Sequence, residues 1–99
     1  MTVQAEPNVP LRAAVVGARI GRTHAAGYAA SDRTELVGIC DTVESRANTL
    51  ADEHGVDARY TDFEMMLREQ RPDVLSIATP QSTHAPLTIL AASQYRPMA

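Results

Sequence analysis

Three short apolar runs divide the chain, and each is followed by a glycine or a polar residue. The runs are LRAAVV at residues 11–16, ELVGIC at 35–40 and VLSIA at 74–78. Continuous apolar runs of this length are typical of strands that are buried on both faces of a parallel sheet. The segment VDARYTD, residues 56–62, adds a weak edge strand. The pattern therefore predicts about four strands.

Stretches with helical spacing separate the strands, and capping residues mark their ends. Gly55 lies just past the second stretch, where a left-handed residue ends many helices. Pro72 stops the third stretch because proline cannot continue a helix. The predicted helices cover residues 20–30 and 42–54, a segment from a capping box at Thr61–Glu64 to Pro72, and a last segment capped by Thr83.

The alternation of strands and helices predicts an α/β fold in which crossover helices join parallel strands. The predicted fold is a partial Rossmann domain, a doubly wound parallel sheet of about four strands with helices on both faces. We expect residues 1–10 to be a flexible leader, 11–93 the Rossmann-type domain and 94–99 a compressed C-terminal stub. A chain of 99 residues provides one modest core and no second domain.

Composition and charge exclude several classes of partner. The net charge is −3, so the chain has no general attraction to nucleic acid or to an anionic membrane. Cys40 is the single cysteine, which rules out an internal disulfide. No segment resembles a signal peptide or is long and apolar enough to span a membrane. We therefore expect a cytoplasmic protein without a metal site, a nucleic-acid partner or a membrane partner.

The segment GARIG, residues 17–21, is typical of the turn that holds the pyrophosphate of a dinucleotide. In such a turn, backbone N–H groups and a helix N-terminus face the phosphates. Gly17 matches the first glycine of the G-x-G-x-x-G fingerprint and Gly21 the third, but the second is absent. Because the turn is one residue short, Ala18 or Arg19 is expected to place a Cβ where a phosphate would lie. Glycine pairs also occur in strand-to-helix turns that bind no ligand.

Asp41 follows the second apolar run, twenty residues after Gly21. An acidic residue at this place accepts hydrogen bonds from the adenosine ribose of a dinucleotide. The alternative interpretation is a helix N-cap, and the two roles are compatible. A carboxylate here repels a 2′-phosphate, which favours NAD over NADP, whereas Arg46, one turn into the next helix, keeps NADP from being excluded.

Five stretches carry a family resemblance in their order and spacing: VVGARIGRTHAAGY, ELVGICDTVESRANTLADEHGV, YTDFEMML, RPDVLSIATPQSTHAP and RPMA. They resemble the GFO/IDH/MocA oxidoreductases, the family of glucose–fructose oxidoreductase and inositol dehydrogenase. In that family an N-terminal Rossmann domain binds NAD(P), and a C-terminal α/β domain supplies much of the substrate pocket. The resemblance implies the nicotinamide-binding portion of an oxidoreductase that transfers hydride at hydroxyl carbons of sugars or cyclitols.

The resemblance also implies roles for single residues. His24 matches the family's histidine after the glycine turn, and for His24 and His84 packing or helix capping is preferred over proton transfer. The implied cofactor-binding residues are Gly17, Ala18, Ile20 and Gly21 at the phosphates, Asp41 and Arg46 at the adenosine ribose, and Ala78, Thr79, Pro80 and His84 at the nicotinamide end.

The chain departs from the family pattern at its C-terminal end as well as in the short turn. The family continues with a fifth strand that ends in Glu-Lys-Pro, whereas here Arg96 stands in place of the lysine. Arginine does not readily exchange a proton, so we assign no catalytic residue and expect the chain alone to be catalytically incomplete. A sugar-like substrate then requires a further domain. The alternatives are a non-catalytic nucleotide-binding module and an inactive gene remnant. Without a fifth strand, the VLSIA edge predicts self-association.

Overall fold

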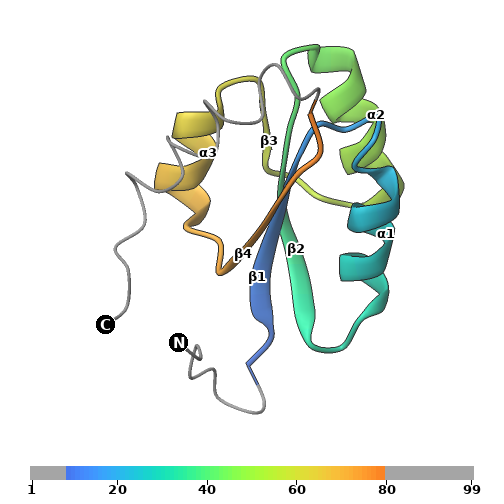
Figure 1. Cartoon of the computed structure of the whole chain (residues 1–99), viewed down its shortest axis with the longest axis vertical. Coiled ribbons are helices and arrows are strands. Elements are labelled where there is room, and N and C mark those ends of the chain that lie inside the picture. The colour runs from blue at the N-terminus through green and yellow to red at the C-terminus, as the bar shows by residue number, and fades with distance from the viewer. Residues whose placement is uncertain (1–8, 80–99) are drawn as a thin grey trace.

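The computed structural model describes residues 9–79, which form a parallel sheet of four strands in the order β3-β2-β1-β4 (Figure 1). The strands are β1 (Leu11–Val16), β2 (Thr34–Cys40), β3 (Arg59–Tyr60) and β4 (Val74–Ile77). The chain returns from β3 to the far side of β1 to form β4, so the strand order reverses between β1 and β4. Open α/β sheets bind ligands at such a switch point. The predicted Rossmann-type sheet is confirmed.

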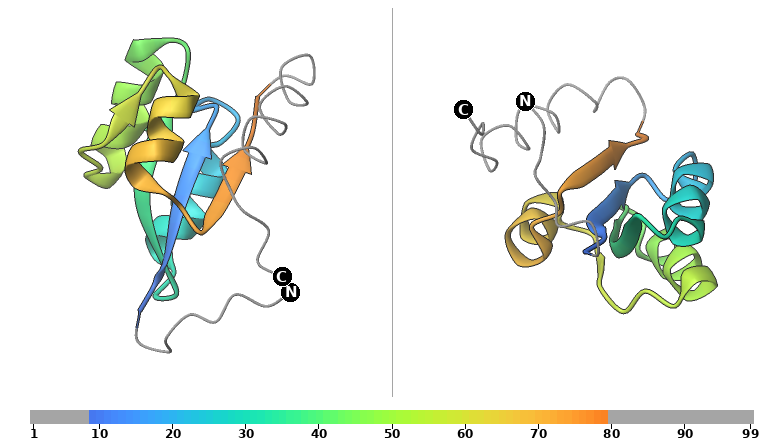
Figure 2. Two further views of the ribbon diagram at one scale, coloured as in Figure 1. Left: turned by 90° about the vertical axis from the view of Figure 1, so that its left-hand side faces the viewer. Right: turned by 90° about the horizontal axis from the view of Figure 1, so that it is seen from below.

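Three helices cover the two faces of the sheet: α1 (Arg22–Ala30), α2 (Glu44–His54) and α3 (Phe63–Gln70). The view from below shows α1 and α2 on one face and α3 on the other (Figure 2). Helices on both faces are therefore confirmed for the described part of the chain. The helix predicted to begin at Thr83 lies outside the described residues.

The structure confirms the predicted end of α2 but not the predicted capping residue of α3. Gly55 ends α2 in the left-handed conformation, with φ at 65°, as predicted. The capping residue of α3 is Asp62, so the prediction of Thr61 is wrong. The Asp62 carboxylate accepts a hydrogen bond from Met65 N at 3.3 Å. A carboxylate at this position reaches the third N–H of the helix, and Thr61 is left outside the first turn.

Each face of the sheet has its own hydrophobic core. Side chains of modest size, four of them alanines, fill the core beneath α1 and α2, so both helices lie close to the strands. Larger side chains fill the core beneath α3. The first core contains Val15, Ala18, Ala25, Ile39, Ala47, Leu50, Ala51 and Val56. The second contains Ala14, Val16, Cys40, Phe63, Met66 and Leu67.

Within the described sheet β3 forms one edge and β4 the other. All four residues of β4 are partly exposed. The self-association predicted for this edge stays a prediction, as do the leader at residues 1–10 and the stub at 94–99, most of which lie outside the described residues. Among residues 9–79, no helix has the length and apolar character needed to cross a membrane.

Candidate functional site

A cleft opens at the carboxyl ends of β1, β2 and β4, where the strand order reverses. Its volume is about 610 Å³, which lies within the usual range for small-molecule sites. Ala18 and Gly21 belong to the turn but do not line the cleft, and Pro80 and His84 lie outside the described residues. The lining includes six residues that the sequence assigned to cofactor binding: Gly17, Ile20, Asp41, Arg46, Ala78 and Thr79.

Several lining residues were not assigned to cofactor binding from the sequence. Arg19 and Thr42 are direct neighbours of assigned residues, so adjacency was the signal that could have found them. Thr61 and Phe63 come from the start of α3, and no motif marks them because only the packing of α3 brings them to the cleft. The unassigned lining residues are Val16, Arg19, Cys40, Thr42, Thr61 and Phe63.

The two glycines of the turn are required by close backbone contacts. Gly17 has φ at 94°, a left-handed conformation, and a Cβ on it would lie 2.4 Å from the carbonyl oxygen of Ala78. A Cβ on Gly21 would lie 2.4 Å from Cγ1 of Val15. Gly17 therefore allows the ends of β1 and β4 to meet, and Gly21 allows α1 to begin directly against β1. These are the close approaches that a dinucleotide turn needs.

Ala18 faces away from the cleft. Its side chain is 3% exposed and belongs to the core beneath α1 and α2. The Ala18 Cβ therefore does not point into the cleft, and the other half of the expectation, obstruction by the Cβ of Arg19, stays a prediction. The side chains of Arg19 and Ile20 are exposed and line the cleft instead. Sequence spacing alone did not distinguish these orientations.

The turn carries backbone donors with unused hydrogen-bonding capacity. The N–H groups of Arg19 and Ile20 have no acceptor among residues 9–79, whereas Gly21 N donates to Gly17 O at 2.8 Å. The N-terminus of α1 follows at once, and its N-cap Gly21 provides no side-chain cap. Free N–H groups beside a helix N-terminus attract an anion such as a phosphate.

Asp41 joins the end of β2 to the turn. Its carboxylate accepts a hydrogen bond from Ala18 N at 2.9 Å and another from Val43 N at 2.8 Å, and the residue is 8% exposed. The N-cap of α2 is Val43, so the N-cap interpretation of Asp41 is wrong. Asp41 instead closes a local turn with the residue two positions later. An ionised carboxylate offers about four acceptor positions, so capacity remains for the hydroxyls of a ribose.

Cys40 lines the cleft beside Asp41 as a neutral thiol. Burial, followed by the negative charges of Asp41 and Asp62, raises the pKa of Cys40 to about 12. A thiol with such a pKa is a poor nucleophile near neutral pH because the thiolate is the reactive form. The other ionisable residues that line the cleft are Arg19, Asp41 and Arg46. These groups are suited to binding rather than to proton transfer.

Thr79 provides a further polar group at the β4 side of the cleft. Its hydroxyl oxygen is buried and has no hydrogen-bond partner among the described residues. Ala78 N donates to Val16 O at 2.8 Å, which fixes this segment against β1. A buried hydroxyl without a partner is a group that needs an explanation.

His24 lies on α1, and its Nδ1 is 3.2 Å from the hydroxyl of Ser76 on β4. The same hydroxyl is 2.5 Å from the Tyr28 hydroxyl, which also comes from α1. These contacts hold α1 against β4, and His24 is not among the residues that line the cleft. The preferred packing interpretation of His24 thus has direct support from these contacts.

The chain matches the model of the GFO/IDH/MocA proteins over residues 11–96, described as an oxidoreductase family with an NAD-binding Rossmann fold. D-Glucoside 3-dehydrogenase of Escherichia coli K12 is 36% identical over 84 residues, which cover 83% of this chain and 24% of that protein.

Solved structures with the same fold include two inositol dehydrogenases. Myo-inositol 2-dehydrogenase from Lactobacillus plantarum has a TM-score of 0.78 at 30% identity, over 87% of this chain and 26% of that one. Scyllo-inositol dehydrogenase from Lactobacillus casei, with bound NAD(H) and scyllo-inositol, has a TM-score of 0.78 at 23% identity, with the same coverage. The chain therefore spans about a quarter of the length of these relatives.

Proposed function

The chain belongs to the GFO/IDH/MocA oxidoreductase family and forms the NAD-binding Rossmann portion of such an enzyme, and we propose how its residues hold NAD and which reaction the holoenzyme performs. The observation that carries the proposal is that the glycine turn and Asp41 meet at one cleft, joined by the 2.9 Å bond from Ala18 N. This arrangement has donors for an anion on one side and a carboxylate for hydroxyls on the other.

The turn from Gly17 to Gly21 holds the pyrophosphate. The free N–H groups of Arg19 and Ile20 donate to its oxygens, and the N-terminus of α1 supplies a favourable partial charge. The fit is supported by the two glycines, since a Cβ on Gly17 would meet Ala78 O at 2.4 Å. The backbone of Ala18 contributes shape rather than a donor, because its N–H is already bonded to Asp41.

Asp41 holds the adenosine ribose through the acceptor positions that its two backbone hydrogen bonds leave open. Arg46 lies at the same end of the cleft, on the first turn of α2. At the other end, Ala78 and the unpartnered hydroxyl of Thr79 face the nicotinamide ribose. Pro80 and His84 follow in the chain and stay predicted contacts at that end.

The holoenzyme transfers hydride between NAD and a hydroxyl-bearing carbon of a sugar or cyclitol. When bound, NAD supplies the nicotinamide ring that accepts or gives the hydride. The residues that line the cleft bind and orient this cofactor, and the high pKa of Cys40 keeps a thiolate away from it. The substrate class is supported by a glucoside dehydrogenase that is similar in sequence and an inositol dehydrogenase that shares the fold.

Titration calorimetry with NAD tests the binding half of the proposal. We expect saturable binding of NAD at one site, and competition by ADP, because the turn and Asp41 are assigned to the ADP half. No heat with either nucleotide, for a chain whose circular dichroism shows a folded α/β protein, would contradict the proposal.

Hydride transfer is tested by following NADH formation with scyllo-inositol and a D-glucoside in a protein that joins this domain to the substrate domain of a family member. We expect NADH to appear with at least one of these polyols. NAD binding without NADH formation from any polyol would instead favour the non-catalytic nucleotide-binding module.

A further inference from the structure

The hydroxyl of Ser76, on β4, lies between two side chains of α1. Its oxygen is 2.5 Å from the Tyr28 hydroxyl and 3.2 Å from Nδ1 of His24. His24 and Tyr28 are four residues apart on α1, so they lie on one face of the helix in consecutive turns. One hydroxyl can donate one hydrogen bond and accept another, so Ser76 can bond to both side chains at once. We call these three residues the clamp.

Tyr28 joins the clamp to the rest of the sheet. Its backbone carbonyl accepts a hydrogen bond from the Thr34 hydroxyl of β2 at 2.7 Å, and its side chain packs against the core beneath α1 and α2. Its own hydroxyl reaches Ser76. Because β1 lies between β2 and β4, Tyr28 connects strands on both sides of β1. A shift of α1 along or across the sheet would therefore break at least one of these contacts.

Apolar packing does not fix α1 against β4. Ala25 is the buried residue of the helix. Among residues 9–79, the core that contains Ala25 is formed by β1, β2, α1, α2 and the turns beside them, and no side chain of β4 belongs to it. The hydrogen bond from Ala78 N to Val16 O at 2.8 Å holds β4 within the sheet but does not involve the helix above it. The clamp therefore supplies a connection, with the defined geometry of a polar network, that packing does not.

The clamp is close in sequence to the cleft on both of the elements that it joins. Ser76 is the register partner of Val15 in β1, and Ala78 and Thr79, which line the cleft, follow it by two and three residues. On the helix side, His24 belongs to the first turn of α1, which begins where the glycine turn ends. The three clamp residues do not line the cleft. They would therefore act on a ligand only through α1 and β4.

We propose that Ser76 is a positioning residue for the cofactor. By holding α1 against β4, its hydroxyl sets the glycine turn at a fixed distance from the β4 side of the cleft, where Ala78 and Thr79 lie. The proposal rests on the proposed function, which places the pyrophosphate at the turn and the nicotinamide ribose at Ala78 and Thr79. A ligand that spans both sides binds more tightly when they are already in place, because less order has to be imposed on binding.

The part of the site assigned to ADP does not depend on the clamp. It consists of the glycine turn and Asp41, and the 2.9 Å hydrogen bond from Ala18 N to the Asp41 carboxylate holds the two together. ADP thus contacts the turn side alone, whereas NAD contacts the turn side and the β4 side. The ratio of the Kd for ADP to the Kd for NAD therefore measures how well the two sides are positioned. A loss of overall stability that leaves the protein folded does not change this ratio.

Titration calorimetry with ADP and with NAD tests the proposal in the Ser76→Ala variant. We expect NAD to bind more tightly than ADP in the wild type. The substitution should reduce the ratio of the two Kd values about 5-fold and change the Kd for ADP by less than about twofold. An unchanged ratio in Ser76→Ala, or a ratio of one in the wild type, would overturn this inference and leave the binding of ADP by the turn intact. Absence of binding by both nucleotides in the wild type would instead overturn the proposed function.

Tyr28→Phe tests the same clamp without a new cavity, because it removes the hydroxyl and keeps the ring. We expect the ratio to fall here too, so the test stands even where Ser76→Ala does not fold. Tyr60→Phe is the matched control. The Tyr60 hydroxyl donates to Glu69 Oε1 at 3.0 Å and accepts from Gln70 Nε2 at 2.8 Å, on the face of the sheet that α3 covers. Urea unfolding shows that each variant is folded during the titrations. An unchanged ratio in Tyr28→Phe, or an equal fall in Tyr60→Phe, would overturn the role given to the clamp.

Discussion

The amino ends of β1 and β4 lie at the end of the sheet opposite the cleft, which we call the amino edge. Polar groups there are bonded to one another. The Arg12 guanidinium donates to Gln70 O at 3.0 and 2.8 Å and to Gln70 Oε1 at 3.0 Å. Arg12 N donates to the Asp73 carboxylate at 2.9 Å, and Asp73 N donates to Arg12 O at 2.7 Å. These hydrogen bonds tie β1 to the segment that leads from α3 into β4.

The carboxyl ends of the same strands, which we call the carboxyl edge, have several polar groups without internal partners. There the N–H groups of Arg19 and Ile20, the guanidinium of Arg46 and the hydroxyl of Thr79 have no partner among residues 9–79. A buried polar group without a partner needs an explanation; the Thr79 hydroxyl is such a group, whereas Arg19, Ile20 and Arg46 are exposed residues. Arg12 and Asp73 are bonded internally at the amino edge, whereas the free groups at the carboxyl edge are available to a ligand.

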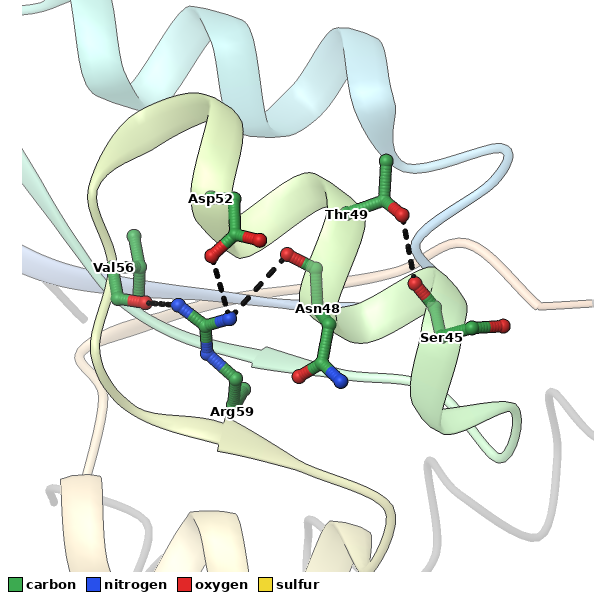
Figure 3. Close-up of polar contacts among 6 residues, drawn as sticks. All are labelled: Ser45, Asn48, Thr49, Asp52, Val56 and Arg59. Atoms are coloured by element: carbon green, nitrogen blue, oxygen red, sulfur yellow. Dashed lines mark hydrogen bonds and ion pairs between the residues drawn. The ribbon is translucent and has the colours of Figure 1, made fainter.

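Arg59 is an arginine whose side-chain partners all belong to the fold. It lies on β3 and donates to Val56 O and to the Asp52 carboxylate, each at 2.7 Å (Figure 3). These contacts hold β3 against the C-terminal end of α2. Arg12 and Arg59 thus have structural partners, whereas Arg19 and Arg46 line the cleft and have no side-chain partner among residues 9–79.

Gly17→Ala should have the largest effect on the cleft. The left-handed φ of 94° and the 2.4 Å approach of a Cβ to Ala78 O should lower the free energy of unfolding by about 3–5 kcal/mol. NAD binding should be lost with it. Urea unfolding and calorimetry measure both. Gly27→Ala is the matched control, because a Cβ there meets nothing within 4 Å. It should stabilise α1 by about 0.5–1 kcal/mol. Equal effects of the two substitutions would refute the role given to Gly17.

Asp41→Ala removes the group that joins the two parts of the cleft. It leaves Ala18 N and Val43 N without acceptors, which should lower the free energy of unfolding by about 2–3 kcal/mol. Asp41→Asn keeps one acceptor oxygen and should cost about half as much. Both variants should weaken NAD binding in calorimetry. Undiminished NAD affinity in a folded Asp41→Ala protein would show that Asp41 only supports the turn.

Arg12→Met tests the amino edge. It removes the hydrogen bonds to Gln70 and should lower the free energy of unfolding by about 1–2 kcal/mol. The Kd for NAD should change by less than about twofold, because substitutions at separate places act independently. The opposite pattern, weaker NAD binding without a change in stability, would reverse the roles assigned to the two edges.

Ionisation of the Cys40 thiol at alkaline pH should lower the free energy of unfolding. The fold raises the pKa of this thiol from 9.0 to about 12, so folding favours the neutral form. The resulting stability is complete below pH 9.0 and is lost as the pH rises toward 12. We expect a loss of about 1 kcal/mol per pH unit in that window. Unfolding curves of the wild type and of Cys40→Ala measure it. An equally steep loss in Cys40→Ala would exclude the thiol as its source. The loss would then be assigned to Tyr60, because burial also raises the pKa of its hydroxyl.

The strands and helices could be predicted because apolar runs and capping residues are local signals. The runs that end at Val16 and Cys40 became β1 and β2, and Gly55 ended α2 as expected. Local signals also placed Gly17 and Asp41 at the ends of adjacent strands. The meeting of these residues in one cleft then followed from the topology of a parallel sheet.

Side-chain directions in the short turn could not be predicted in the same way. Ala18 was expected at the phosphates, and its side chain is buried in the core; Asp41 was expected at the adenosine ribose, with an N-cap as the alternative, and its bond to Ala18 N was not foreseen. Both outcomes depend on how the turn packs across β2, which no sequence spacing encodes. Thr61 and Phe63 reach the cleft only through the packing of α3.

Amide chemical shifts measured by NMR during titration with NAD test the central claim most directly. The free N–H groups at the carboxyl edge should be occupied by the cofactor, so the largest shift changes should appear at Arg19 and Ile20, followed by Thr42 and Thr79. Arg12 and Asp73 should hardly change. Changes centred on Arg12 and Asp73, or saturation with NAD that leaves Arg19 and Ile20 unmoved, would contradict the account.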